Sequence, residues 1–146
     1  SDALIDALGD ARLGCANFEA AEAMSMGQDN VYYYRFDYDD HNKPHALGAA
    51  HALEIPFVFG TLGQSMRRVG LYSEEQLERA EPLSELMGGY WANFARSGDP
   101  NGPGLPEWPA YGRSERMRMY FDQASGARPT DNVEKCDFWS GTEGGF

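Results

Sequence analysis

Apolar and polar positions follow first a helical and then a strand-like pattern at the start of the chain. Residues 3–26 carry apolar side chains at roughly helical spacing, which predicts a helix that Gly14 interrupts. Residues 27–30 have the composition of a turn. Residues 31–38 are rich in aromatic and β-branched side chains and predict the clearest strand of the chain.

A second helical pattern begins at Ser73, whose hydroxyl and Gln76 have the spacing of a capping box. An apolar stripe follows at helical spacing, and Gly98 is placed to end the helix. The members of the stripe are Leu83, Leu86, Met87, Tyr90, Trp91 and Phe94. Pro82 predicts either a kink or the start of a second helix within this stretch.

Shorter elements complete the pattern. Residues 55–59 are apolar but contain Pro56, which favours a buried turn or short helix over a central strand. A short strand is predicted at 117–121, a turn-rich stretch at 125–132 and a short helix at 135–139. So few strands and helices do not easily make a self-contained layered domain. We therefore expect the aromatic strand to lie beside strands from outside this segment.

Composition limits the classes of function. The chain has 146 residues, of which 42% are hydrophobic, enough for one domain with a core. The net charge of -11 disfavours nucleic acid and an anionic membrane surface as partners, because like charges repel. No apolar run approaches the ~20 residues that span a bilayer. The chain begins at Ser1 within a helical pattern, so we expect a processed or excised piece of a longer protein.

The two cysteines, Cys15 and Cys136, leave two interpretations open. Because no C-x-x-C pair occurs, the spacing excludes a zinc ribbon or a thioredoxin-type site. The cysteines are either two buried thiols or a disulfide that closes a very long loop. A disulfide favours an oxidising compartment, and in that case we expect a secreted or periplasmic protein.

The candidate chemistry centres on His51, which precedes Glu54 and an apolar run that ends at Gly60. This segment follows the predicted strand and a polar loop. We therefore expect the imidazole at the end of a sheet, where general bases are commonly held. His45 is a rival, but it lacks the acidic and apolar residues that follow His51. His41 lies among charged loop residues, and we expect it to be solvated.

A metal site is a second interpretation of the same region. Asp39, Asp40, His41 and His45 are residue types that bind zinc. Acids beside histidines are nevertheless common in loops, and the tight H-E-x-x-H spacing does not occur in the sequence. We therefore predict that the chain holds no metal.

Several stretches together resemble the type B carboxylesterases, the α/β-hydrolase group that includes the cholinesterases and the para-nitrobenzyl esterases. They are the His51 segment and residues 90–101, 108–111, 119–121 and 136–139, in the order of that family. The resemblance implies an α/β fold in which residues 1–146 form the C-terminal segment of an α/β-hydrolase domain. This segment carries the last strands of the sheet with covering helices and is incomplete on its own.

The resemblance implies a serine ester hydrolase whose triad runs serine, acid and histidine along the chain, with His51 as the histidine. No G-x-S-x-G elbow is present, because Ser65 and Ser114 lack the second glycine. We expect the serine, the acid and the oxyanion hole in the missing N-terminal part of the same protein. The isolated chain is therefore expected to be inactive. The implied substrate is an uncharged or weakly charged carboxylic ester, and no cofactor is implied.

Supporting roles and alternatives to an enzyme stay open. Glu54, three residues after His51, is a candidate to brace the histidine, and a purely structural role is equally open. The cholinesterases place paired cysteines at the positions of Cys15 and Cys136, which implies a disulfide between them. Two non-enzymatic hypotheses stay open: a cholinesterase-like adhesion or partner-binding module, and a stand-alone interaction module that pairs through its aromatic strand.

Overall fold

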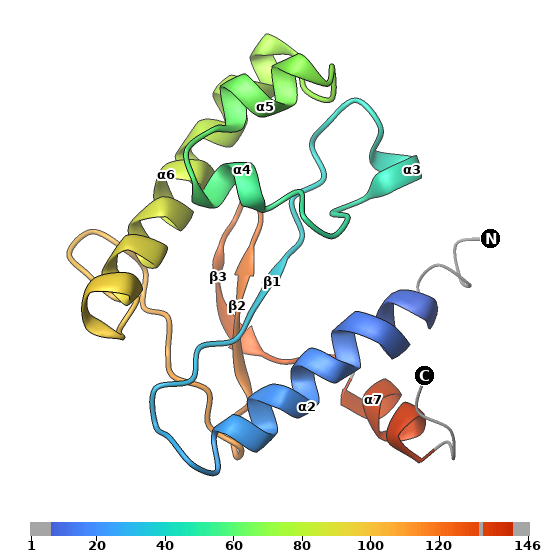
Figure 1. Cartoon of the computed structure of the whole chain (residues 1–146), viewed down its shortest axis with the longest axis vertical. Helices are drawn as coiled ribbons and strands as arrows, with labels where there is room; N and C mark the ends of the chain where they lie inside the picture. The colour runs from blue at the N-terminus through green and yellow to red at the C-terminus, as the bar shows by residue number, and fades with distance from the viewer. Residues whose placement is uncertain (1–6, 132, 142–146) are drawn as a thin grey trace. The chain divides into compact units, whose positions relative to one another are not determined.

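The structure is a computed structural model that describes residues 7–131 and 133–141 (Figure 1). The chain divides into two compact units, each assembled from separate stretches of sequence. The first unit comprises Ser1–Tyr33, Ala110–Arg118 and Pro129–Phe146. The second unit comprises Tyr34–Pro109 and Met119–Arg128.

The first helix of the first unit contains a π-helical turn. Residues 7–9 are helical, η1 (Asp10–Gly14) is the π-helical turn, and α2 (Cys15–Met24) continues it. The buried side chains of α2 are Cys15, Phe18 and Ala21, whose three-residue spacing places them on one face. The predicted break at Gly14 is wrong, because a π-helical turn widens the helix without ending it. Residues 3–6 of the predicted helix lie outside the described residues.

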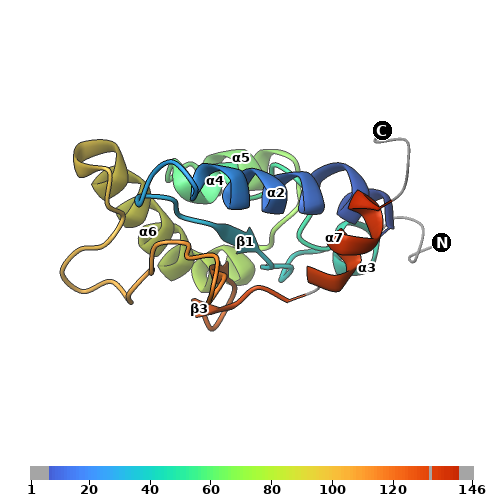
Figure 2. The ribbon, with the colours of Figure 1, turned by 90° about the horizontal axis from the view of Figure 1, so that it is seen from below.

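A disulfide joins distant parts of the chain within the first unit. Cys15 on α2 is bonded to Cys136 on α7 (Val133–Ser140), 121 residues later in sequence. This is the pair that the resemblance to the esterases implied. Helix α7 packs against α2 and η1, as Figures 1 and 2 show. Beside it lies a small core of Phe18, Ala21, Val31 and Tyr111.

The acidic side chain of Glu22 ties α2 to the stretch after residue 110. Tyr111 and Arg113 donate hydrogen bonds to its carboxylate, and Arg116 donates a third at 3.1 Å. Burial opposes the charge of Glu22, but these hydrogen bonds and the charges of both arginines outweigh it and lower its pKa.

The sheet has three strands in the order β1-β2-β3. They are β1 (Tyr34–Phe36), β2 (Met117–Phe121) and β3 (Gly126–Pro129). β1 runs parallel to β2, with Tyr34 opposite Met119 and Phe36 opposite Phe121. A turn at residues 122–125 joins β2 to β3.

Two predictions that concern the sheet need correction. The strand predicted at 31–38 has ladder pairing only at 34–36, because only these residues lie opposite β2. Aromatic and β-branched content therefore overestimated its length. The turn-rich stretch predicted at 125–132 contains β3, in which Gly126 and Pro129 are tolerated because the strand lies at an edge of the sheet.

Two short helices of the second unit lie beside the long helix α6 (Glu74–Ser97) (Figure 1). α4 (Ile55–Val58) and α5 (Leu62–Arg68) both pack against it and against each other. The short helix predicted at residues 55–59 is confirmed by α4. Two helices of this unit, α3 (Pro44–Leu47) and α5, were not predicted from the sequence.

Helix α6 begins and ends as its sequence predicts. Ser73 and Gln76 form the reciprocal capping box, and Gly98 closes the helix with φ of 77°. Pro82 lies inside one continuous helix, so a second helix does not start there. Phe94 is 47% exposed although the apolar stripe placed it in the core. The whole last turn, residues 94–97, is exposed, so the stripe is buried only up to the preceding turns.

Aromatic side chains form the core between α6 and β1 in the second unit. The ring of Tyr34 lies 5.1 Å from that of Trp91 and 5.8 Å from that of Phe121, in edge or tilted contacts. Trp108 stands edge-on to Phe121 at 5.4 Å. Tyr90 donates a hydrogen bond to the Pro106 carbonyl at 2.7 Å. Such offset and edge contacts stabilise aromatic pairs beyond the area that they bury.

Candidate functional site

His51 occupies an exposed corner of a tight turn between α3 and α4. The Leu53 N–H donates to the Ala50 carbonyl at 3.1 Å, which closes a four-residue turn with His51 in second place. Ala52, in third place, has φ of 73°. A positive φ at that place is typical of a type II turn. The backbone therefore presents the imidazole to solvent at the turn's corner.

Ala52 has an unusual backbone for a residue with a side chain. Glycine normally takes the position with positive φ, because a Cβ atom there is strained by about 1–2 kcal/mol. Strained backbone of this kind persists where the flanking structure fixes it and is frequent at functional sites. The sequence gives no sign of this strain, since alanine is compatible with helix, loop or turn.

The chain that follows His51 is anchored to α6. The side chain of Phe57 is completely buried, and the Ser84 hydroxyl donates to the Phe57 carbonyl at 2.9 Å. The N–H groups of Phe57 and Val58 donate to the Glu54 carbonyl at 3.0 and 3.1 Å. These contacts hold α4 and, through it, the end of the His51 turn.

The chain that precedes His51 is anchored by His41. The prediction of a solvated His41 is wrong, because its side chain is only 2% exposed. Its Nδ1 accepts a hydrogen bond from the Lys43 N–H at 3.1 Å, and its Nε2 lies 2.9 Å from the Gly48 carbonyl. Charged neighbours in the sequence suggested solvation, but backbone groups satisfy both ring nitrogens, so burial is tolerated.

Glu54 is half-buried and lies three residues after the candidate histidine. Burial of Tyr34 and the negative charge of Glu54 raise the pKa of the Tyr34 hydroxyl. Within the described residues, no hydrogen bond joins the side chains of Glu54 and His51. His45 is exposed on α3. The charge of Glu54 therefore acts on Tyr34 of β1, and the imidazole of His51 is exposed to solvent.

The carboxylate of Asp40, one of the two loop acids, is held by other partners. Arg79 donates hydrogen bonds to the Asp40 carboxylate at 2.8 and 3.2 Å, and Gln76 donates at 3.4 Å. The hydrogen bond with Arg79 holds the pKa of Asp40 below its usual value. Among residues 7–131 and 133–141, no group of three or more histidine, cysteine or acidic side chains is arranged to hold a metal ion.

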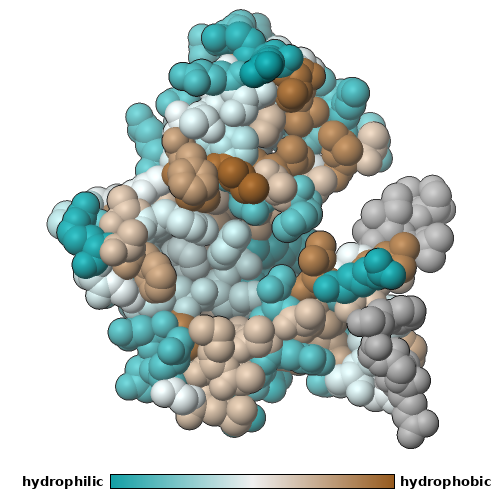
Figure 3. All heavy atoms as spheres, viewed as in Figure 1, coloured by the Kyte–Doolittle hydropathy of each residue, from teal (hydrophilic) through white to brown (hydrophobic). Residues whose placement is uncertain are grey.

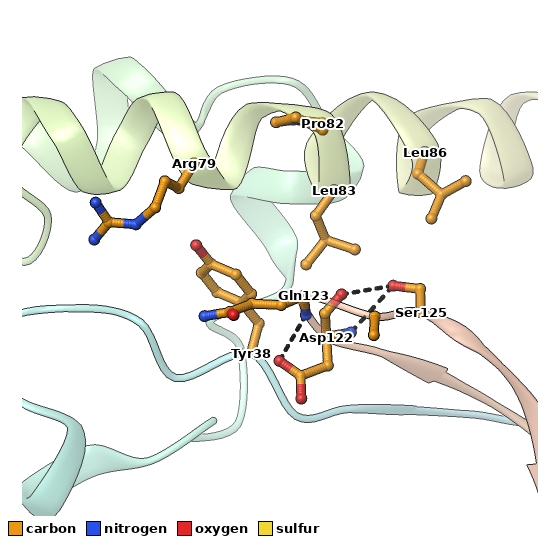
Figure 4. Close-up of a pocket in the computed structure, with 9 residues that line it drawn as sticks. Tyr38, Arg79, Pro82, Leu83, Leu86, Asp122, Gln123 and Ser125 are labelled. Carbon is orange, nitrogen blue, oxygen red and sulfur yellow. Dashed lines mark hydrogen bonds between the residues drawn. The ribbon is translucent and has the colours of Figure 1, made fainter.

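A pocket of about 320 Å³ lies between α6 and the turn that joins β2 to β3 (Figure 4). The apolar side chains of Leu83 and Leu86 extend from the helix toward that turn, and the Tyr38 hydroxyl points toward α6. Burial and the neighbouring Asp40 carboxylate raise the pKa of Tyr38 to about 12. His51 is not among the residues that line the pocket, so the two are separate features.

Apolar side chains are exposed beside the His51 turn. Phe59 is 72% exposed and Ile55 is 48% exposed, at either end of α4. Figure 3 shows hydrophobic atoms at the surface in the region of this helix. Large apolar side chains exposed together often mark a surface that another segment or partner covers. None of the helices in the described part of the chain combines the length and the apolar character needed to cross a membrane.

The chain resembles esterases in both sequence and structure. It matches the carboxylesterase family over residues 1–139. Carboxylesterase 5A of Mus musculus is 36% identical over 146 residues, which cover 97% of this chain and 25% of that protein. Acetylcholinesterase of Gallus gallus is 33% identical, covering 95% of this chain and 18% of its own length. The chain thus spans about a quarter of the length, or less, of these curated relatives.

Solved esterase structures contain a similar arrangement. A carboxylesterase of Geobacillus stearothermophilus has a TM-score of 0.59 and 38% identity, covering 82% of this chain and 23% of its own. A thermophilic PNB esterase has a TM-score of 0.60 and 29% identity, covering 75% of this chain and 22% of its own. Both have the α/β-hydrolase fold, and the small sheet with its helices is a part of that fold. The predicted fold class is confirmed.

Proposed function

Because this chain belongs to the carboxylesterase family, we propose that it is the C-terminal part of a serine ester hydrolase in which His51 is the catalytic base. The exposed imidazole at the corner of an anchored turn carries this proposal. Such a turn holds the ring at a fixed place while leaving it accessible to a hydroxyl on another part of the protein. The substrate class is an uncharged or weakly charged carboxylic ester.

The proposed role of His51 is proton transfer. A serine hydroxyl is a weak nucleophile at neutral pH. The neutral imidazole takes its proton as the oxygen attacks the ester carbonyl, and then returns it to the departing alcohol. An acyl-serine forms. The imidazole then takes a proton from water as the water attacks this ester, and returns the proton to the serine oxygen as the carboxylic acid leaves. A carboxylate outside this chain fixes the tautomer of the ring and stabilises the imidazolium.

The rest of the protein is the proposed partner of the surface beside His51. The exposed Ile55 and Phe59 follow the turn, at the two ends of α4, and burial of such side chains stabilises an interface by about 25 cal/mol per Å². The N-terminal part of the same protein would supply the serine, the acid and the oxyanion hole. On this proposal the 146-residue chain alone has no esterase activity.

Two further assignments belong to the same proposal. Glu54 supports the His51 turn through its backbone, because its carbonyl accepts the N–H groups of Phe57 and Val58. The Cys15–Cys136 disulfide supports an oxidising compartment, and we infer that the protein is secreted or periplasmic.

The first test of the proposal is replacement of His51 in the full-length protein that carries this segment. His51→Ala is expected to lower kcat for p-nitrophenyl acetate by about 10⁴-fold or more, because the serine loses its base. His45→Ala is the matched control, since His45 is exposed in the same region and is expected to leave kcat unchanged. Retention of most activity in His51→Ala, or equal losses in both variants, would sink the assignment.

A further inference from the structure

We propose that His41 is a positioning residue for His51. The inference rests on the proposed function, because it requires His51 to be the base. His41 is buried, it is not exposed to a substrate, and its ring nitrogens hydrogen-bond to the backbone of its own loop. It acts by fixing the Gly48 carbonyl, and with it the chain that leads three residues later to His51.

The hydrogen bonds of His41 define its protonation. The Lys43 N–H is a donor, so Nδ1 must present a lone pair and carries no proton. The Gly48 carbonyl is only an acceptor, so Nε2 must carry the proton and donate it across 2.9 Å. His41 is therefore a neutral imidazole with its proton on Nε2. Any other state of the ring loses at least one of these two hydrogen bonds.

The ring of His41 and the neighbouring Asn42 both contact the turn at residues 70–72. The ring centroid lies 5.7 Å from that of Tyr72, which is also buried. The neighbouring Asn42 donates its backbone N–H to the Leu71 carbonyl at 2.9 Å and its side-chain amide to the Gly70 carbonyl at 3.2 Å. These contacts fix residues 41 and 42 on the turn at residues 70–72. The position of Gly48 is then tied to this turn through the ring.

The tie to Gly48 shortens the stretch that is free to move around His51. On the carboxyl side, the next anchor is Phe57, held by Ser84. With both anchors, the free stretch is confined to the residues between Gly48 and α4. Without the His41 ring it extends back toward Lys43, and a longer free segment samples more conformations. The strained φ of Ala52 requires fixed flanks as well.

A simple space-filling role for His41 makes a different prediction. If the ring only filled volume against Tyr72, then His41→Phe would preserve its role and His41→Gln would not. If the ring positions Gly48, His41→Gln preserves the role, because the glutamine amide offers both a donor and an acceptor. The two variants therefore distinguish hydrogen bonding from packing at one site.

The test measures kcat and KM for p-nitrophenyl acetate in the full-length protein. His41→Phe is expected to lower kcat by about 10- to 100-fold, the effect of a base displaced by about 1 Å, with KM changed less than about two-fold. His41→Gln is expected to recover most of that loss. Wild-type kcat in His41→Phe, or a His41→Gln variant as impaired as His41→Phe, overturns the positioning role.

His51→Ala in the same assay separates the two proposals. If His51→Ala stays active, the proposed function fails whatever the His41 variants do. If His51→Ala is inactive and His41→Phe matches wild type, only the positioning role fails. A second measurement does not depend on the variants folding. Nitrogen NMR of the wild-type protein labelled in histidine is expected to find the His41 proton on Nε2, and a charged ring or a proton on Nδ1 overturns the inference.

Discussion

At the scale of single residues, one half-buried acid links parts of the chain that are distant in sequence. The carboxylate of Glu22 accepts hydrogen bonds from Tyr111, Arg113 and Arg116. These partners lie about ninety positions away in sequence, so no local pattern indicates them. The stability of the first unit should therefore depend on the ionisation of this one carboxylate.

Glu22→Gln is expected to lower the free energy of unfolding by about 1–3 kcal/mol at pH 7, the range for hydrogen bonds to a charged group. The folded pKa of Glu22 lies below its unfolded value. Its stabilisation is thus complete above the unfolded pKa of about 4.3 and is lost as the pH falls through the folded pKa. Urea denaturation at pH 7 and at pH 3 should find a difference between wild type and variant that shrinks in acid.

Glu19→Gln is the matched control, because Glu19 is an exposed acid on the same helix. It is expected to change the unfolding free energy by less than about 0.5 kcal/mol. An equal effect of both substitutions, or a Glu22→Gln effect that does not vary with pH, would contradict the role of the carboxylate.

At the scale of elements, local chemistry predicted helix ends better than strand ends. Ser73, Gln76 and Gly98 act through backbone groups of neighbouring residues, so their roles are readable from spacing. A strand instead needs a partner that can lie far away in sequence, and the pairing with β2 limits β1 to residues 34–36. His51 was chosen as the candidate from its segment, whereas the hydrogen bond between His41 and Gly48 joins residues whose contact the sequence does not reveal.

Pro82 is the element-scale feature with the clearest energetic consequence. It lies exposed inside α6 and supplies no N–H for the helical ladder. Pro82→Ala restores that donor and is expected to raise the free energy of unfolding by about 1–3 kcal/mol. Urea denaturation followed by helical circular dichroism is the measurement.

Pro44→Ala is the control for this substitution, since Pro44 stands at the start of α3, where no N–H is needed. Removing Pro44 should give no gain and a small loss, because the unfolded chain becomes more flexible. A loss of stability in Pro82→Ala would mean that the proline fits the helix without breaking its hydrogen bonding.

At the scale of the whole molecule, each unit draws on residues far apart in the chain. The first unit brings together α2, the stretch from Ala110 to Arg118, and α7, which lie far apart in the sequence. A single covalent link, Cys15–Cys136, closes it across 121 residues. A long closed loop removes much of the conformational freedom of the unfolded chain, so the first unit should depend on this link more than the second.

Reduction of the disulfide is expected to lower the stability of the first unit by roughly 4–5 kcal/mol, the entropy of a loop of this length. Hydrogen exchange with and without a reductant should show loss of protection in α2 and α7 and retained protection in α6. The double variant Cys15→Ser with Cys136→Ser should behave like the reduced protein and be insensitive to reductant. Equal loosening of both units would contradict this assignment.

The same covalent link affects what a protease can release. A single cut at the exposed residues 103 and 104 would break the backbone between Cys15 and Cys136. The two pieces would still migrate together on a gel without reductant and separate only after the thiols are freed. An intact band under oxidising conditions is therefore no proof of an uncut polypeptide, and any nicked form in a preparation becomes visible only in its reduced lane.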